Sequence, residues 1–258
     1  MLPPPPKKNT MKTFNYITIG FVVIYHLILI HNIKNITINC IFTYLVIQFG
    51  IHAGFHRWIS HNSFTPNRIV GFIICCCGCL GFQYGPLWWA SQHKKHHSHC
   101  DSMEDIHTPN KSFFHSHIGW LLFENISKSN KDLILKWKKT NPEIVVLNNI
   151  YIYLSVNAIY CTLLYNYSYS ITNFYICPVV LVWHATWATN SFCHKPTSNY
   201  ICSPCDNFIV GIINLGEGFH KEHHIYPQQS CHGFRKWYQF DFTYVVLFLL
   251  SKLHLVQL

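Results

Sequence analysis

Charged residues are scarce in this sequence. Only 11% of its 258 residues are Asp, Glu, Lys or Arg, whereas about a quarter is usual in soluble domains. Half of the residues are hydrophobic and 16% are aromatic. This balance argues against an ordinary water-soluble enzyme and indicates a membrane protein. The 19 Lys and Arg residues are dispersed among apolar segments, which argues against nucleic-acid binding.

The N-terminal region shows no sign of a cleavable signal peptide. The first residues, MLPPPPKKNTMK, are polar and proline-rich, and no small-residue cleavage site follows the first apolar run. The twelve cysteines therefore predict a reducing, cytosol-facing protein with buried thiols, not a disulfide scaffold. Two CxxC pairs, Cys76/Cys79 and Cys202/Cys205, leave a zinc site as the alternative. The first pair lies in an apolar run, where small apolar core filling explains it better.

Four apolar runs are long enough to cross a bilayer, at residues 14–33, 38–55, 143–165 and 171–192. Short links join them in pairs, so we predict an all-α membrane protein with four transmembrane helices in two hairpins. Lys34 is the one basic residue in these links. The positive-inside rule therefore places both termini and the polar segments outside the links in the cytosol.

The polar segments around the hairpins are expected to form a cytosolic helical cap. A fifth apolar run, 69–90, is assigned to this cap, because a crossing there would separate the histidine clusters described next. The predicted order is an N-terminal tail (1–13), hairpin 1 (14–55), a first part of the cap (56–142), hairpin 2 (143–192), and a second part of the cap with a C-terminal docking helix (193–258).

Histidine is in unusual excess, with 19 residues. Nine of them are clustered where the predicted topology brings them to one side: His56, His61, His93, His96, His97, His194, His220, His223 and His224. Positions i, i+3 and i+4 share one face of a helix, so each HxxHH box can present three imidazoles to one place. Imidazole is the commonest metal ligand. Nine such ligands are too many for one tetrahedral zinc ion and predict a site for two metal ions.

The ligand type leaves the metal open. Nitrogen ligands suit Zn, Cu, Fe and Ni. A redox metal that activates O2 beside a lipid chain fits the predicted membrane location, whereas zinc would indicate hydrolysis at the membrane face.

The boxes HxxxxH, HxxHH and HxxHH, flanked by paired apolar runs, resemble those of the membrane fatty acyl desaturases of the stearoyl-CoA type. The stretches GIHAGFHRWISH, FQYGPLWWASQHKKHH, SFFHSHIGWLL, NSFCH and NLGEGFHKEHHIYP also resemble that family, in the same order. The resemblance implies an endoplasmic reticulum enzyme with two iron ions (Fe2+/Fe3+). It implies that the enzyme uses O2 to introduce a cis double bond, at the delta-9 position, into a C16 or C18 acyl-CoA. The sequence has no haem-binding HPGG motif, so the electrons are expected from a separate cytochrome b5.

The same resemblance assigns roles to individual residues. The nine clustered histidines carry over as iron ligands, and Asn190 as a ligand acting through water. Glu217, in GEGFH, is expected to accept a hydrogen bond from an imidazole N–H. Two departures lie beside the boxes: Ser91-Gln92 stands where the family has Arg-Asp, and Lys221-Glu222 where Asn-Tyr is common. They concern head-group recognition and leave an acyl-lipid as the alternative substrate. A lipid hydroxylase or ketolase, or an inactive membrane scaffold, are the alternative functions.

Helix periodicity suggests where the acyl chain runs. Counting back from His56 in steps of four places Gln48 and Tyr44 on the same helix face, leading away from the metals. We therefore predict that Tyr44 and Gln48 line the substrate tunnel, with Tyr44 near its floor. The alternative is that Tyr44 packs against the first apolar helix and contacts no substrate.

Overall fold

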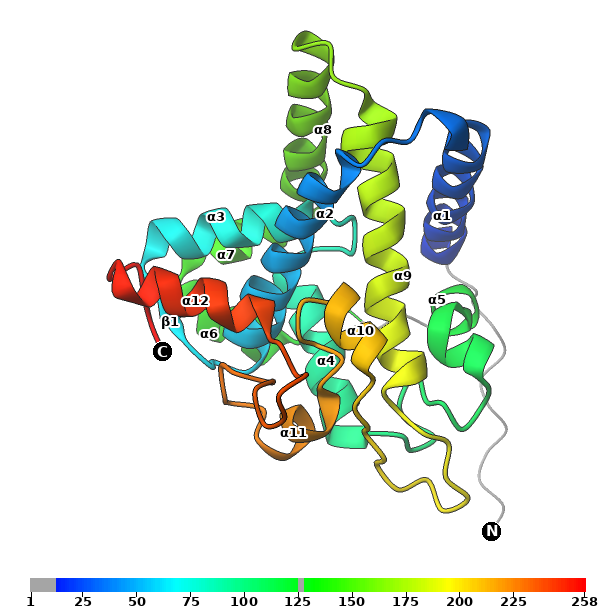
Figure 1. Cartoon of the computed structure of the whole chain (residues 1–258), viewed down its shortest axis with the longest axis vertical. Coiled ribbons are helices and arrows are strands. Elements are labelled where there is room, and N and C mark those ends of the chain that lie inside the picture. The colour runs from blue at the N-terminus through cyan, green and yellow to red at the C-terminus, as the bar shows by residue number, and fades with distance from the viewer. Residues whose placement is uncertain (1–12, 125–127) are drawn as a thin grey trace.

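The computed structural model describes the chain at residues 13–124 and 128–258, which are predominantly helical (Figure 1). The predicted N-terminal tail lies almost wholly outside these residues. The α-helices are α1 (Thr13–His31), α2 (Cys40–Phe49), α3 (Arg68–Cys79), α4 (Pro86–His99), α5 (Trp120–Phe123), α6 (Lys131–Thr140), α7 (Pro142–Leu147), α8 (Ile150–Asn166), α9 (Cys177–Phe192), α10 (Phe208–Ile213), α11 (His220–Ile225) and α12 (Phe242–Lys252). Shorter elements are a 3-10 turn η1 (Ile33–Asn35), π-helical segments η2 (Gly50–Ser60), η3 (His115–Gly119) and η4 (Thr172–Ile176), and strands β1 (Thr65–Pro66) and β2 (Val256–Gln257). The prediction of an all-helical architecture is confirmed, apart from one two-stranded ribbon.

Two pairs of helices correspond to the two predicted hairpins. In Figure 1, α1, α8 and α9 lie roughly along the long axis of the molecule, α2 is tilted, and α1 lies on the side of α9 away from α8. Helix α2 packs against α9, and α1 contacts α9 as well. The link of the first hairpin also meets η4 at the start of the fourth run, because Asn173 accepts a hydrogen bond from Thr37 N at 2.7 Å and donates one to Asn35 O at 2.9 Å.

The helices are shorter than the apolar runs suggested. In the described ranges, none combines the length and the apolar character needed to cross a membrane, so the four predicted transmembrane helices find no support there. The third run begins as the separate helix α7, and α8 starts only at Ile150, where the Asn149 side chain caps it by accepting from Tyr151 N. The second run changes to π-helix at Gly50 and continues to Ser60.

The run 69–90 forms α3, a turn and α4, and does not continue as one helix. Asn67 caps α3 by accepting a hydrogen bond from Val70 N at 2.9 Å. Helix α3 packs on η2 so closely that a Cβ atom at Gly50 would lie 2.2 Å from Gly78 N. The break brings α4, and with it the second histidine box, beside η2 instead of extending it away from the first box.

The C-terminal segment docks onto the same body. Thr243 of α12 donates a hydrogen bond to Leu215 O at 3.0 Å. Strands β1 and β2 pair antiparallel, with Thr65 opposite Gln257. The end of the chain is thereby fixed beside the segment that follows His61.

The cysteines differ from the prediction at one pair. Ten are free thiols, most of them buried or half-buried, as expected. Cys100 and Cys202, however, form a disulfide across a sequence separation of 102 residues. The prediction of thiols throughout is therefore wrong for this pair, because the fold brings two distant segments together. The pairing also removes Cys202 from the alternative zinc site with Cys205.

Candidate metal centre

The π-helical segment η2 explains the spacing of the first box. His56 and His61 are five residues apart, a spacing that an ideal α-helix does not align. A π-helix closes its hydrogen bonds between residues five apart, so these two positions come to lie near one another. The ring centroids of His56 and His61 are 5.0 Å apart. The first box is thus aligned by a change of helix type.

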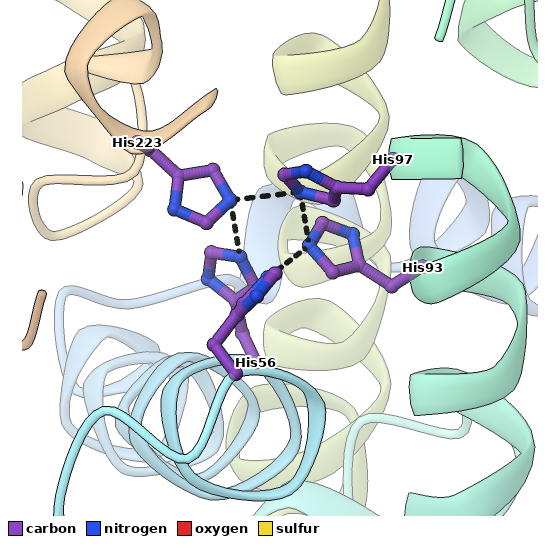
Figure 2. A group of neighbouring side chains, drawn as sticks. His56, His93, His97 and His223 are labelled. Carbon is purple, nitrogen blue, oxygen red and sulfur yellow. Dashed lines mark hydrogen bonds between the residues drawn. The ribbon is translucent and has the colours of Figure 1, made fainter. Parts of the chain in front are cut away.

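Five histidines form the first group, with their ring nitrogens directed at one another: His56, His61, His93, His97 and His223. Figure 2 shows the neighbouring rings and their contacts. Nε2 of His97 lies 3.0 Å from Nε2 of His93 and 3.0 Å from Nε2 of His223. Nε2 of His56 lies 3.1 Å from that of His223. His61 Nε2 is 2.8 Å from His93 Nε2.

The remaining four clustered histidines form a second group beside the first. His96 comes from α4, His194 follows α9, and His220 and His224 come from α11. The Nε2 atoms of His220 and His224 are 3.1 Å apart, and the rings of His194 and His224 have centroids 4.8 Å apart. The nine histidines predicted as one constellation are thus brought together by the fold, divided five and four.

The donor set fits metal ions. A neutral imidazole has one N–H, so a ring of converging Nε2 atoms cannot satisfy all of its members by hydrogen bonds alone. The buried Nε2 of His194 has no hydrogen-bond partner in the described chain. Buried polar atoms without a partner are costly, and a metal ion in each group would satisfy them.

Carboxylates fix three of the rings from behind. Nδ1 of His56 lies 2.7 Å from Glu217 Oε2. Nδ1 of His96 lies 2.8 Å from Asp105 Oδ2, and Nδ1 of His194 lies 3.0 Å from Asp101 Oδ1. A carboxylate on one ring nitrogen holds the proton there and leaves Nε2 to bind metal. The structure thus gives Glu217 the contact expected of it, whereas the roles of Asp101 and Asp105 were not foreseen. Their place just after the second box was the available signal.

A buried ion-pair cluster supports Glu217. The Arg57 side chain is fully buried and donates from Nε and Nη2 to Glu217 Oε1, at 3.0 and 2.8 Å. It also donates to both oxygens of Asp241, at 2.9 and 3.0 Å. Burial by itself would raise the pKa of Glu217, but His56 and Arg57 hold that pKa well below its usual value. Glu217 is therefore an anion that accepts from His56.

His232 is a neighbour of the first group that the sequence reasoning did not include among the nine clustered histidines. Its ring is buried, and its centroid lies 4.5 Å from that of His223. Its Nδ1 is 3.2 Å from Glu217 Oε2. The signal was its distance of only eight residues from the third box, but proximity in sequence did not indicate a contact.

Burial keeps several of the clustered imidazoles neutral by lowering their pKa, among them His93, His97 and His220. It lowers the pKa of His97 to about 3, with His56 and other histidines adding to the effect. Burial likewise lowers the pKa of His93 and His220 well below the ordinary value of 6.5. Neutral imidazole is the form that binds metal, so the pocket is prepared for ligation at neutral pH.

An apolar cavity of about 330 Å³ lies beside the first group. His93, Gln92, His107 and Asn190 contribute to its wall. The rest of the lining is mostly aliphatic and aromatic, and includes Phe21, Trp89, Trp120, Tyr153, Leu154 and Trp187. This apolar lining suits a long hydrocarbon chain that would lie beside the histidines on one side of the cavity.

The two residues predicted for the tunnel lie elsewhere. Tyr44 donates a hydrogen bond to Ile213 O, and Gln48 donates to Asn214 Oδ1 at 2.6 Å. Neither lines the cavity described above. Asn190 does line it, and its backbone oxygen accepts from Ser116 at 2.8 Å. The water-mediated role of Asn190 stays a prediction.

Comparison with known proteins gives one consistent result. A family model described as fatty acid desaturase matches residues 36–245. The chain is similar to an sn-1 stearoyl-lipid 9-desaturase of Anabaena variabilis, with 32% identity over 80% of this chain and 76% of that protein. It is also similar to an icosanoyl-CoA 5-desaturase of Limnanthes douglasii, with 32% identity over 77% of this chain and 57% of that protein. Acyl-CoA desaturase 1 of Saccharomyces cerevisiae is 26% identical over 84% of this chain and 44% of its own length. The chain therefore spans about half the length of these two CoA-type relatives.

Proposed function

We propose a specific reaction for this chain, which belongs to the fatty acid desaturase family and is a desaturase enzyme. The proposed reaction introduces a cis double bond into a saturated C16 or C18 acyl chain and uses two iron ions and O2. The observation that carries this proposal is the position of His93. It belongs to the five-histidine group and also forms part of the wall of the apolar cavity. A hydrocarbon chain in that cavity lies beside the metal ligands.

The residues present would hold two irons. The first would be bound by His56, His61, His93, His97 and His223, and the second by His96, His194, His220 and His224, with Asn190 reaching it through water. When bound, iron supplies the redox chemistry with O2 that an unactivated C–H bond requires. Zinc has no redox chemistry and would not support this reaction.

The protein's own contribution is orientation and exclusion of water. Glu217, Asp101 and Asp105 fix the imidazoles, as described above. In the cavity wall, Trp89 donates to Gln83 at 3.1 Å, and Gln83 donates to Thr186 at 3.0 Å. The Trp89 ring also stacks on His93, with centroids 5.1 Å apart. These contacts make a rigid wall that holds a methylene chain in one position relative to the metals.

The head group of the substrate is the least constrained element. We propose acyl-CoA, with the delta-9 position as the site of the double bond. An acyl-lipid is the second candidate, favoured by the similarity to stearoyl-lipid 9-desaturases, one of which is matched over 76% of its length. The electron donor in either case would be a separate cytochrome b5.

A membrane setting is part of the proposal. Large apolar side chains that do not line the cavity are exposed along α1 and α8: Tyr16, Val23, Ile24, Leu27 and Ile30 on α1, and Tyr151, Ile152, Ile159, Leu163 and Tyr165 on α8. Contiguous apolar surface of this kind indicates contact with lipid or protein. We propose that these helices meet the bilayer of the endoplasmic reticulum, as a multi-pass protein whose metal centre faces the cytosol.

The test is complementation of a yeast strain that requires unsaturated fatty acids. Growth without supplement, together with mass spectrometry and gas chromatography of the cell lipids, would give the double-bond position and chain length. A product that gained oxygen would indicate a hydroxylase instead. The control is a His97→Ala variant expressed at the same level. Detergent-purified protein should contain close to two irons per chain, and stoichiometric zinc without iron would contradict the proposal.

A further inference from the structure

The disulfide between Cys100 and Cys202 lies next to the second histidine group. Cys100 directly follows the last residue of α4, three residues after the end of the second box. Cys202 lies in the segment between His194 and the third box. The disulfide therefore connects two of the ligand-bearing segments across 102 residues of sequence.

The sulfur atoms face one of the metal-box rings. Cys202 Sγ lies 3.7 Å and Cys100 Sγ 3.8 Å from Nδ1 of His224. Cys100 Sγ is also 3.9 Å from Nδ1 of His194. Three other rings have a carboxylate at Nδ1. In the part of the chain that the structure describes, His224 has the two sulfurs there instead.

The residues that follow the two cysteines make a second link at the same place. Asp101 Oδ2 accepts a hydrogen bond from Ser203 N at 2.7 Å. Asp101 Oδ1 lies 3.0 Å from His194 Nδ1, and the side chain is fully buried. The disulfide thus fixes the distance between the segments that contain Cys100 and Cys202. This keeps Asp101, which follows Cys100, in the position from which it orients His194.

We propose that Cys100 and Cys202 are positioning residues that form a redox-sensitive clamp on the metal site of His96, His194, His220 and His224. The inference rests on the proposed function only in that a metal ion occupies this site. With the disulfide closed, Asp101 and His224 are held in place and the metal is retained. With it open, the two segments separate more easily and the metal leaves faster.

The step that opens the clamp is thiol–disulfide exchange with a cellular thiol. The Cys100–Cys202 bond breaks, and each sulfur gains one hydrogen. Two small-molecule thiols supply the two electrons and two protons and are joined in one disulfide. The state of the clamp would thereby follow the thiol balance of the compartment.

The experiment uses the full chain, purified in detergent without reductant and loaded with iron. Alkylation and peptide mass spectrometry report whether Cys100 and Cys202 are paired. Transfer of iron to a colorimetric chelator is then followed with and without a phosphine reductant. Loss of outer contacts of metal ligands typically weakens metal binding about 10–100-fold, so we expect one of the two irons to leave roughly tenfold faster after reduction.

Two variants make the result specific. The double variant Cys100→Ser/Cys202→Ser should release that iron at the fast rate with or without reductant. Cys231→Ser, which removes a free thiol elsewhere, should keep the response of the unmodified chain. Circular dichroism should show the same helix content before and after reduction, because a general loss of structure would release both irons.

Specific outcomes would overturn the clamp. One is that both cysteines are found as free thiols in the unreduced protein. Another is that iron release is the same in both redox states, or that the double variant still responds to reductant. Protein that binds two irons and desaturates, but gives any of these results, refutes the clamp and leaves the proposed function intact. Protein that binds no iron fails the proposed function instead.

Discussion

Replacing Glu217 by Gln would test whether the buried carboxylate sets the metal affinity of the first histidine group. The change keeps the shape of the side chain and removes its charge. Arg57 donates two hydrogen bonds to Oε1, so the remaining carbonyl oxygen should stay on that side. The new NH2 group then occupies the position of Oε2, which lies 2.7 Å from His56 Nδ1.

This places two donors face to face. If His56 binds metal through Nε2, its Nδ1 carries the proton, and an amide NH2 cannot accept from it. Rotation of His56 moves Nε2 away from the metal, and a shift of the proton to Nε2 removes the lone pair that binds it. A lost outer partner of this kind lowers metal affinity about 10–100-fold, which is about 1.4–2.7 kcal/mol. The metal-free protein should lose about 1–3 kcal/mol of unfolding free energy from the weakened contact with Arg57.

Asp241→Asn is the matched control. Asp241 is also buried and binds the same Arg57, but none of its contacts is with the nine clustered histidines in the described chain. It should lose at least as much unfolding free energy as Glu217→Gln and should keep normal metal affinity. The assay is competition for iron against a chelator of known affinity, with thermal unfolding of the metal-free proteins alongside. Equal metal affinity of the two variants would refute the reasoning, because it would show that Glu217 acts only through stability.

Three further outcomes are expected. His97→Ala and His223→Ala should each lose at least one iron and all measurable turnover. His99→Ala should keep both irons and much of its activity, because His99 pairs with Glu104 at the surface. Equal loss in all three variants would show that the ligand assignment does not discriminate. Leu154→Trp should fill part of the apolar cavity and shift the products toward shorter acyl chains, as measured by gas chromatography. The control is Leu163→Trp, at an exposed position of the same helix outside the cavity, and it should leave the chain lengths of the products unchanged. The metal-free protein should lose stability as the pH falls from the ordinary histidine pKa of 6.5 toward about 3. In this range His97 binds a proton in the unfolded chain but not in the folded protein, where burial lowers its pKa. A thermal-unfolding midpoint that does not change with pH in this range would contradict this prediction.

Local sequence patterns indicated that the chain is mostly helical and which histidines the fold brings together. The two HxxHH boxes present their imidazoles together because i, i+3 and i+4 share a helix face in any α-helix. The nine histidines and Glu217 were identified in this way or through motif resemblance, and the fold brings them together. These features depend on neighbours within a few residues, which the sequence lists directly.

The long-range contacts of Tyr44 and Gln48 could not be obtained in this way. Periodicity placed Tyr44 and Gln48 on one face, and they contact the adjacent residues Ile213 and Asn214. What occupies the space opposite that face is decided by a segment more than 160 residues away. The sequence therefore predicted a face, but not whether substrate or protein would cover it.

The sequence by itself determined which histidines are candidate metal ligands and that the chain is mainly helical. The tertiary structure decided the change to π-helix at Gly50, where α3 approaches too closely for a side chain. It also decided the pairing of Asp101 with His194, the Arg57 cluster and the Cys100–Cys202 disulfide. Each of these contacts joins residues that are far apart along the chain. Such contacts arise from the packing of whole elements against one another, and no short window of sequence contains that information.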